Sequence, residues 1–219
     1  TKKQGKMISI KTFTFNPFQE NTYVITNANK ACWIVDPGMF SASENEELLH
    51  YIKSQNLTPK AIINTHAHLD HILGVHFLQE TFEIPFYIHE LDEPTLQYGP
   101  IAASMYGLGT IQMPKSCNFY KDELFDLGGT PIQVIHTPGH APGHVILYCA
   151  SENWVINGDM LFAGSIGRTD LPGSNHDDML TSLREKIVTL PDDTKVYCGH
   201  GIATTIKNEK ATNPYLLNL

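Results

Sequence analysis

Four side chains that can bind a metal lie within six residues, in the segment His66-Ala67-His68-Leu69-Asp70-His71. Imidazole nitrogens and carboxylate oxygens are the ligands that zinc and similar divalent ions accept. His66 and His68 are two residues apart, so in an extended chain both can point to one ion. Asp70 and His71 follow the bend and could reach a second ion nearby. The alternative, a solvated loop that is merely rich in histidine, is much weaker at this density of ligands.

An apolar run, Ala61–Ile63, stands directly before this cluster and predicts a buried strand. We therefore place the cluster on the loop that leaves the strand Lys60–Asn64, and we expect a helix over Asp70–Thr81. Aspartate is a favoured residue at a helix start, so Asp70 also has a purely structural interpretation as the N-cap of that helix.

Three further residues of the same chemistry stand after predicted strands. They are His140 after Ile132–Ile135, Asp159 after Trp154–Ile156, and His200 after Lys195–Cys198. Each alone is as compatible with a turn or a hydrogen-bonded surface group. A glycine stands directly before His140, Asp159 and His200, and its lack of a side chain would allow close approach to an ion. Together with the first cluster, they supply seven ligands from four strand ends.

Seven ligands suit two ions. We predict one ion held by His66, His68 and His140, a second held by Asp70, His71 and His200, and Asp159 bridging both. Each ion would keep a position for water, as catalytic sites do and closed structural sites do not. Water shared by two divalent ions ionises near neutral pH and becomes a strong nucleophile. Asp70 would also orient this water and accept its proton. Because the set contains no thiolate, zinc is the first candidate, with iron or manganese as alternatives.

The remaining candidates carry weaker signals. We expect His144 to hydrogen-bond to the backbone or to a ligand, and His136 to be buried. Four other histidines are interpreted as structural or solvated: His50, His76, His89 and His176. Arg168 lies in a glycine-punctuated loop, where it could bind an anionic group of a substrate. A salt bridge from Arg168 to Asp170 that shapes the loop is the alternative, and both interpretations remain open.

Composition limits what the chain can be. Its 219 residues, 42% hydrophobic and 17% charged, suit one globular domain spanning 1–219. The net charge of −8 argues against nucleic acid and anionic membranes as partners. No apolar run approaches the roughly 20 residues of a membrane span. Residues 1–6 carry no secretory signal and are expected to be a tail left by cloning or processing, with Met7 as the natural start. Four dispersed cysteines without a CxxC pair favour a reducing, cytoplasmic location.

The hydrophobic pattern predicts the elements that must position these ligands. Besides those already given, we expect strands at Met7–Phe15, Thr22–Thr26, Cys32–Val35, Pro85–Ile88 and Val145–Cys149, and helices at Glu44–Gln55, Met179–Leu190 and Thr205–Ala211. This order favours an α+β fold of two β-sheets between outer layers of helices. Residues 90–120 are interrupted by glycine and proline but contain apolar residues. They are either a segment packed over the site or a helix-and-loop excursion with no contact to substrate.

These motifs resemble a known family. Thr65–His71 (THAHLDH), the His140 of TPGHAPGH, the Asp159 of NGD and the His200 of CGHG are similar to the metallo-β-lactamase fold superfamily, in particular to short glyoxalase II (hydroxyacylglutathione hydrolase) members. The likeness covers roughly Met7 to Pro214. It implies a four-layer αββα sandwich of two mixed sheets, with a dinuclear centre at one edge formed by the seven residues given above.

The resemblance also narrows the expected chemistry. It implies a metal-dependent hydrolase of a small acyl-thioester such as S-lactoylglutathione, acting as a monomer or weak homo-oligomer. Asp159 stands where many true β-lactamases carry a cysteine or another non-bridging residue, which disfavours antibiotic hydrolysis. The chain stops without the C-terminal helical domain that supplies glutathione contacts in longer members, so the thioester class is better supported than glutathione. A one-iron persulfide dioxygenase is the main rival, and a non-catalytic binding protein is a third interpretation.

Overall fold

Two six-stranded mixed sheets dominate the computed structural model, which describes residues 7–219. The first sheet, in the order β1-β2-β3-β4-β5-β6, contains β1 (Ser9–Phe15), β2 (Glu20–Thr26), β3 (Ala31–Val35), β4 (Thr58–Ile63), β5 (Phe86–Ile88) and β6 (Asn118–Phe119). The second, in the order β14-β13-β10-β9-β8-β7, contains β14 (Thr204–Thr205), β13 (Lys195–Cys198), β10 (Trp154–Gly158), β9 (Val145–Cys149), β8 (Pro131–His136) and β7 (Leu124–Asp126). The expected tail 1–6 lies outside the described residues.

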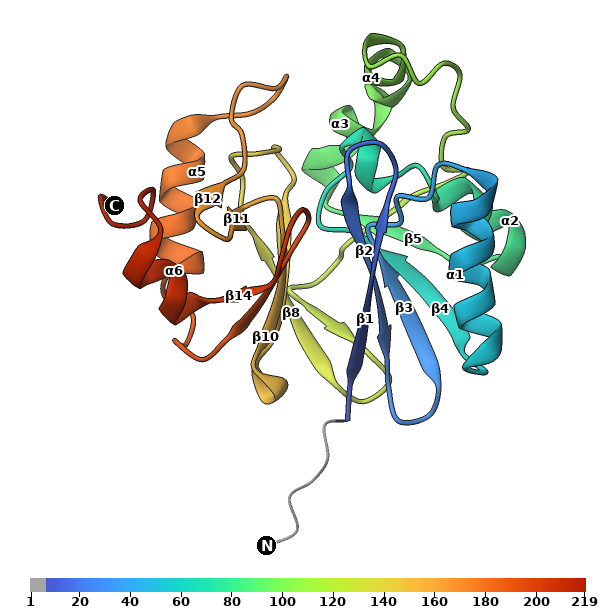
Figure 1. Ribbon diagram of the computed structural model, residues 1–219, viewed down its shortest axis with the longest axis horizontal. Coiled ribbons are helices and arrows are strands. Elements are labelled where there is room, and N and C mark those ends of the chain that lie inside the picture. Colours follow the sequence, from blue (N-terminus) through green and yellow to red (C-terminus); the bar gives the residue numbers. More distant parts are fainter. Residues whose placement is uncertain (1–6) are drawn as a thin grey trace, which may run out of the picture.

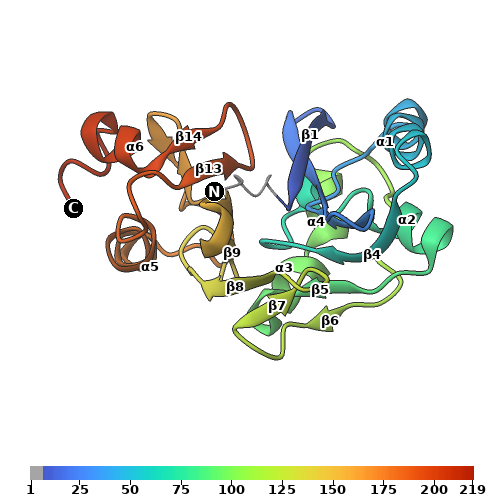
Figure 2. The ribbon, with the colours of Figure 1, turned by 90° about the horizontal axis from the view of Figure 1, so that it is seen from below.

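Helices cover the outer face of each sheet (Figure 1). On these faces lie α1 (Ala42–Ser54), α2 (Val75–Phe82), α5 (His176–Ser182) and α6 (Ile206–Thr212), whereas α3 (Glu93–Gln97) and α4 (Gly99–Met105) lie at one end of the sheets. In the view of Figure 2, α1 and α2 lie beside the first sheet, and α5 and α6 lie on the far side of the second. A small hairpin of β11 (Leu161–Phe162) and β12 (Ser165–Ile166) completes the fold.

Three hydrophobic clusters separate the four layers. One lies between the first sheet and α1 and α2, one between the two sheets, and one between the second sheet and α5 and α6. Alternation along the strands divides neighbouring residues between these clusters: Ile62 belongs to the first and Ile63 to the second. In the same way Leu147 faces the other sheet and Ile146 faces the helices. The period of two residues explains why these strands are apolar throughout, and the αββα fold is confirmed.

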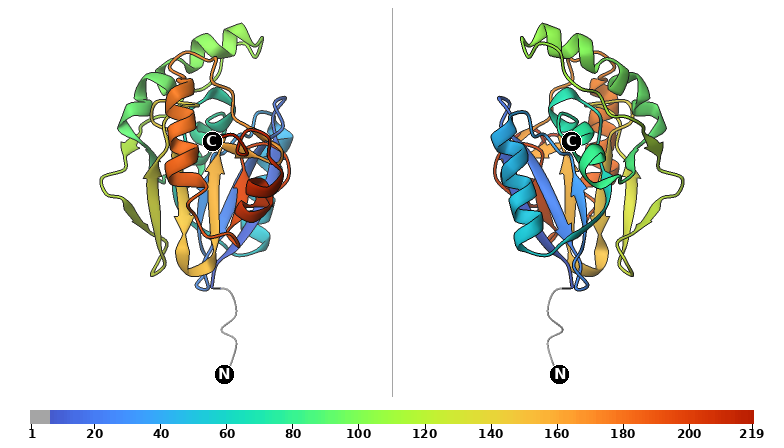
Figure 3. Two further views of the ribbon diagram at one scale, coloured as in Figure 1. Left: turned by 90° about the vertical axis from the view of Figure 1, so that its left-hand side faces the viewer. Right: turned by 90° about the vertical axis from the view of Figure 1, so that its right-hand side faces the viewer.

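Strand direction brings the ligand loops to one edge. The strand β3 is parallel to β4, and β10 is parallel to β13, so the carboxyl ends of each pair lie together. Backbone hydrogen bonds join the two sheets at this edge, from Val145 N–H to the Thr65 carbonyl and from Asn21 N–H to the Gly199 carbonyl. The side views of Figure 3 show α4 at this end of the molecule, opposite the turns that join β2 to β3 and β9 to β10.

The predicted helix over Asp70–Thr81 is wrong in its first half. A short 3₁₀ helix, Leu69–His71, is followed by a break, and α2 begins only at Val75 with Gly74 as its N-cap. Asp70 therefore caps no helix. Its carboxylate lies near His71 and His200 instead.

The bounds of other elements differ from the predicted ones, but the architecture is as predicted. The helix Met179–Leu190 begins at His176, where the Asn175 side chain accepts from the Asp178 N–H, and continues as a π-helical turn over Leu183–Ile187. Residues 90–120, predicted to be irregular, contain α3, α4 and β6. No helix of the described residues is both long enough and apolar enough to cross a membrane.

The core between the sheets provides the first prediction. Leu147 on β9 is fully buried there, so Leu147→Ala should lower the free energy of unfolding by about 2–5 kcal/mol, because it removes apolar contacts and leaves a cavity. Urea denaturation measures this change. Leu124→Ala is the matched control, since Leu124 on β7 is 60% exposed and its truncation should cost no more than about 0.5 kcal/mol. Equal losses in the two variants would contradict the packing described.

Candidate metal centre

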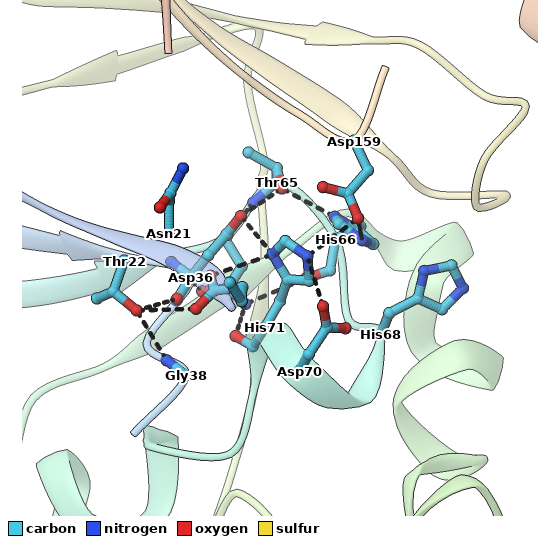
Figure 4. A network of polar contacts seen from close by, with 12 residues as sticks. Asn21, Thr22, Asp36, Gly38, Thr65, His66, His68, Asp70, His71 and Asp159 are labelled. Atoms are coloured by element: carbon cyan, nitrogen blue, oxygen red, sulfur yellow. Dashed lines mark hydrogen bonds and ion pairs between the residues drawn. The ribbon is translucent and has the colours of Figure 1, made fainter. Parts of the chain in front are cut away.

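The structure gathers all seven sequence-predicted residues at the edge where the strands end. The stretch that follows β4 supplies His66, His68, Asp70 and His71. The loops after β8, β10 and β13 supply His140, Asp159 and His200. Figure 4 shows His66, Asp70 and His71 converging with Asp159, which approaches from the opposite sheet, and His68 to one side of them. The donor atoms form two groups, each with its members within 4.8 Å of one another: His66, His68 and His140, and Asp70, His71, Asp159 and His200.

The first group is built from three imidazoles. His68 Nδ1 lies 3.0 Å from His140 Nε2, a separation at which both nitrogens can reach one ion. His140 Nε2 lies 3.2 Å and His66 Nε2 lies 3.6 Å from Asp159 Oδ2. Two donors about 2.05 Å from one tetrahedral ion are about 3.3 Å apart, so these separations suit a single divalent cation.

The second group combines carboxylates with imidazoles. Asp70 Oδ2 is 3.0 Å from His200 Nε2 and 3.4 Å from His71 Nε2. The same two nitrogens lie 3.6 Å and 3.1 Å from Asp159 Oδ2. One oxygen of Asp159 is thus within 3.6 Å of imidazoles from both groups, which is the arrangement expected of a bridging ligand.

A set of hydrogen bonds orients four of these histidines. Each Nδ1 contacts an oxygen, so that Nε2 is turned toward the centre: His66 to Thr65 Oγ1 at 2.9 Å, His71 to Asp36 Oδ2 at 2.9 Å, His140 to the Arg168 carbonyl at 2.8 Å, and His200 to the Phe18 carbonyl at 3.1 Å. Metal-binding histidines characteristically hold their other nitrogen in this way, which fixes the tautomer and the ring orientation.

Sequence reasoning missed the acids behind His71. Asp36 was not among the residues singled out from the sequence, yet its carboxylate also accepts from the Thr65 N–H at 2.7 Å and from Thr65 Oγ1. Glu20 is fully buried, with Oε1 3.4 Å from His71 Nδ1. Burial, with Asp36 and Asp70 nearby, raises the pKa of Glu20 well above its usual value, although His71 opposes the shift. The position of Asp36 at a strand end beside β4 was the available signal.

The centre has an excess of buried acceptors that fits a cation. His66 Nε2 and Asp159 Oδ1 are buried and have no hydrogen-bond partner. In the described part of the chain, the ion pairs of Glu20, Asp36, Asp70 and Asp159 are all with histidine, and none is with lysine or arginine. Unpaired acceptors cost several kcal/mol in a buried site, so two divalent cations suit this donor set.

The pKa shifts follow from the same charges. Burial resists ionisation of Asp70, but the charge on His71 and a hydrogen bond from His200 outweigh it and hold the pKa of Asp70 below its usual range. Burial also opposes protonation of His200, yet hydrogen bonds with Asp159 and Asp70 raise its pKa to about 10. Burial lowers the pKa of His66 and His68. The carboxylates therefore draw positive charge to the second group in particular.

Glycine makes room for the bridging carboxylate. A Cβ on Gly199 would collide with Asp159 Oδ1, and a Cβ on Gly167 would collide with the Asp159 carbonyl. Gly158 adopts φ +56°, a conformation that favours glycine, at the start of the turn to Asp159. The expectation that glycine permits close approach thus applies most directly to Asp159.

The other candidates separate as follows. His144 is buried, its Nε2 accepts the Asp159 N–H at 3.1 Å, and it therefore supports the backbone of a candidate ligand, as expected. His136 is only half-buried, contrary to expectation, because it lies in a surface groove stacked on His89. The Arg168 side chain forms the salt bridge with Asp170, at 2.6 Å and 2.9 Å, while its backbone carbonyl orients His140.

A cavity of about 530 Å³ opens above the centre. His68, Asp70, His140, Asp159 and His200 form part of its lining, and residues of α3 and α4 form one wall. Of the two interpretations of residues 90–120, the structure favours the segment packed beside the site. Arg168 also lines this cavity.

Comparison with known proteins gives consistent results. Residues 15–200 match the family described as the metallo-beta-lactamase superfamily. A probable metallo-hydrolase of Bacillus subtilis, YqgX, is 38% identical over 91% of this chain and 93% of its own length. A Haemophilus influenzae protein named hydroxyacylglutathione hydrolase GloC is 33% identical over 95% of this chain and 98% of its own.

Solved structures agree in fold. The structure described as BLEG-1 B3 metallo-beta-lactamase is 39% identical, has a TM-score of 0.87, and matches 95% of this chain and 99% of its own. That of TTHA1623 in a di-iron-bound form is 38% identical, has a TM-score of 0.84, and matches 94% of this chain and 100% of its own. Similarity over nearly the whole of each chain means that the ligand-bearing loops fall within the shared region.

The hydrogen bond from His71 to Asp36 gives a second prediction. Asp36→Asn should weaken metal binding by about 10–100-fold, because the amide cannot replace the carboxylate that orients and polarises His71. Competition with a chromophoric chelator measures the affinity. Asp177→Asn, an exposed carboxylate in the first turn of α5, is the control and should bind metal as the parent chain does. Unchanged affinity in Asp36→Asn would refute the orienting role.

Proposed function

The chain is a metal-dependent hydrolase that belongs to the metallo-β-lactamase superfamily, and we propose that it hydrolyses small acyl-thioesters of the S-lactoylglutathione type. The observation that supports the chemistry is the position of Asp159 Oδ2 between two groups of donors at the floor of an open cavity. The thioester class is supported by the 33% identity to the Haemophilus protein named hydroxyacylglutathione hydrolase, over nearly the full length of both chains.

Each group of donors would hold one cation. His66, His68 and His140 would bind the first, Asp70, His71 and His200 the second, and Asp159 would be shared. Two divalent cations bound there would lower the pKa of water and polarise a thioester carbonyl. Zinc is the first metal to test, and the relative solved in a di-iron form makes iron the alternative.

The residues of the chain supply positioning and proton transfer. The Asp70 carboxylate is 16% exposed and lines the cavity, where it would orient the attacking water and accept its proton. The contacts of the four Nδ1 atoms keep the imidazole lone pairs directed inward before any substrate arrives. Such preorganisation avoids rearranging charged groups during the reaction.

β-Lactam hydrolysis is a second candidate, because a solved structure described as a B3 metallo-beta-lactamase is 39% identical to this chain. The residue at position 159 argues against this activity, because Asp159 stands where many true β-lactamases carry a cysteine or another non-bridging residue. The persulfide dioxygenase proposed from sequence would use one iron and consume oxygen. Metal content and substrate choice together separate the three.

Removing a ligand tests the proposal. His68→Ala should reduce the metal content below the two ions per chain expected of the parent. It should also lower kcat/KM for the thioester by more than about 100-fold, which is the largest loss expected when only a residue that hydrogen-bonds to a metal ligand is changed. Elemental analysis and turnover of S-lactoylglutathione provide the two readouts. His50→Ala, an exposed histidine on α1, is the matched control and should change neither.

Three results would contradict the proposal. One iron per chain with oxygen uptake would favour the dioxygenase, and β-lactam turnover without thioester turnover would favour the lactamase. Inertness of the metal-loaded protein toward every substrate class would favour a binding protein.

A further inference from the structure

The walls of the cavity differ in character from its floor. Around the polar histidines and aspartates stand Phe18, Tyr98, Met105, Tyr106, Leu171 and Pro172. They come from three separate segments: the turn between β1 and β2, the helix α4 with the residue on either side of it, and the loop before α5. An apolar wall of this kind, continuous with a reactive floor, is typical of a site that holds an apolar part of its substrate.

The apolar wall is organised before any ligand binds. The rings of Phe18 and Tyr106 meet edge to face, with centroids 5.2 Å apart. The Tyr98 hydroxyl contacts Met105 Sδ at 3.3 Å. Despite these contacts, Met105 is 71% exposed and Tyr106 is 48% exposed, which leaves much of their apolar surface in water. Large apolar side chains gathered at the mouth of a cavity commonly mark a binding surface.

Lysine and arginine side chains are scarce around the same cavity. Among the described residues that line it, Arg168 is the single lysine or arginine, and its Nε and Nη2 both donate to the Asp170 carboxylate. Glutathione carries two carboxylates, which proteins hold with arginine, lysine or helix N-termini. With Arg168 neutralised by Asp170, the wall offers little to attract such an anion.

We propose that the cavity selects thioesters with an apolar acyl group, aromatic or branched aliphatic, and makes no strong use of glutathione. This inference rests on the proposed thioester hydrolysis. Biological thiol carriers are polar or charged, so the apolar part of a natural thioester is its acyl group. That group would lie against Phe18 and Tyr106 while the carbonyl reaches the His and Asp floor.

A panel of four substrates tests the inference on the metal-loaded enzyme. It combines two acyl groups, lactoyl and phenylacetyl, with two thiols, glutathione and N-acetylcysteamine. The phenylacetyl thioesters should show kcat/KM at least about 10-fold above the lactoyl thioesters with either thiol, because burying the ring removes apolar surface from water. Exchange of glutathione for N-acetylcysteamine should change kcat/KM by less than about 3-fold.

The opposite pattern overturns the inference but leaves the proposed function standing. A preference for lactoyl over phenylacetyl, or a large loss when glutathione is replaced, would show that polar groups direct recognition. If none of the four thioesters is hydrolysed, the proposed function itself fails and the inference fails with it.

Substitution of two tyrosines of similar exposure tests whether the wall contacts the acyl group. Tyr106→Ala should raise KM for the phenylacetyl thioesters about 5–10-fold with little change in kcat, since it removes binding that ground state and transition state share. Lactoyl thioesters should be unaffected. Tyr215→Ala, in the C-terminal segment and 52% exposed, is the matched control and should leave all four substrates unchanged. If Tyr106→Ala preserves the acyl preference, the wall does not contact the acyl group and the inference is wrong.

Discussion

The carboxylate of Asp159 is the group that links the two halves of the candidate metal centre. Its Oδ2 approaches imidazoles from the first sheet and from the second, while its other oxygen is buried without a partner. A buried charge needs an opposite charge, and the nearest groups able to carry one are histidines that are themselves potential ligands. The need for positive charge at this point explains why the donors converge and why cations suit the site.

The directions of the strands bring the histidines to Asp159. The carboxyl ends of β4, β10 and β13 share an edge, so residues far apart in the chain become neighbours there. The alternation of buried residues between two apolar clusters then fixes the register, because a slip by one residue would reverse which side chains face each layer. The centre is thus held by the cores of the sandwich together with the hydrogen bonds that orient its histidines.

Much of the fold and of the candidate metal centre could be predicted from the sequence. The apolar runs around Ile62 and Leu147 indicated buried strands, and the spacing of His66, His68, Asp70 and His71 indicated a metal site. The grouping of Asp70 with His71 and His200 was predicted, but the helix start at Asp70 was wrong, because aspartate is also a favoured N-cap residue. Asp36 and Glu20 were missed because their partner, His71, is remote in sequence. The aromatic wall depends on α3 and α4, two helices too short to leave a clear periodicity.

The segment that carries those helices lies between β5 and β6 and contributes none of the seven candidate ligands. Its first residues nevertheless support the ligand loops, because the buried Asp92 carboxylate accepts from the Ala67 N–H at 2.5 Å and from the Gly143 N–H at 2.9 Å. Under the proposed function, the part of the apolar wall that follows Asp92, from Tyr98 to Tyr106, and the seven candidate ligands therefore lie on separate stretches of the chain. Evolution can exchange one while conserving the other, which gives descendants of a common ancestor a route to new substrates at little risk to their reactive centre.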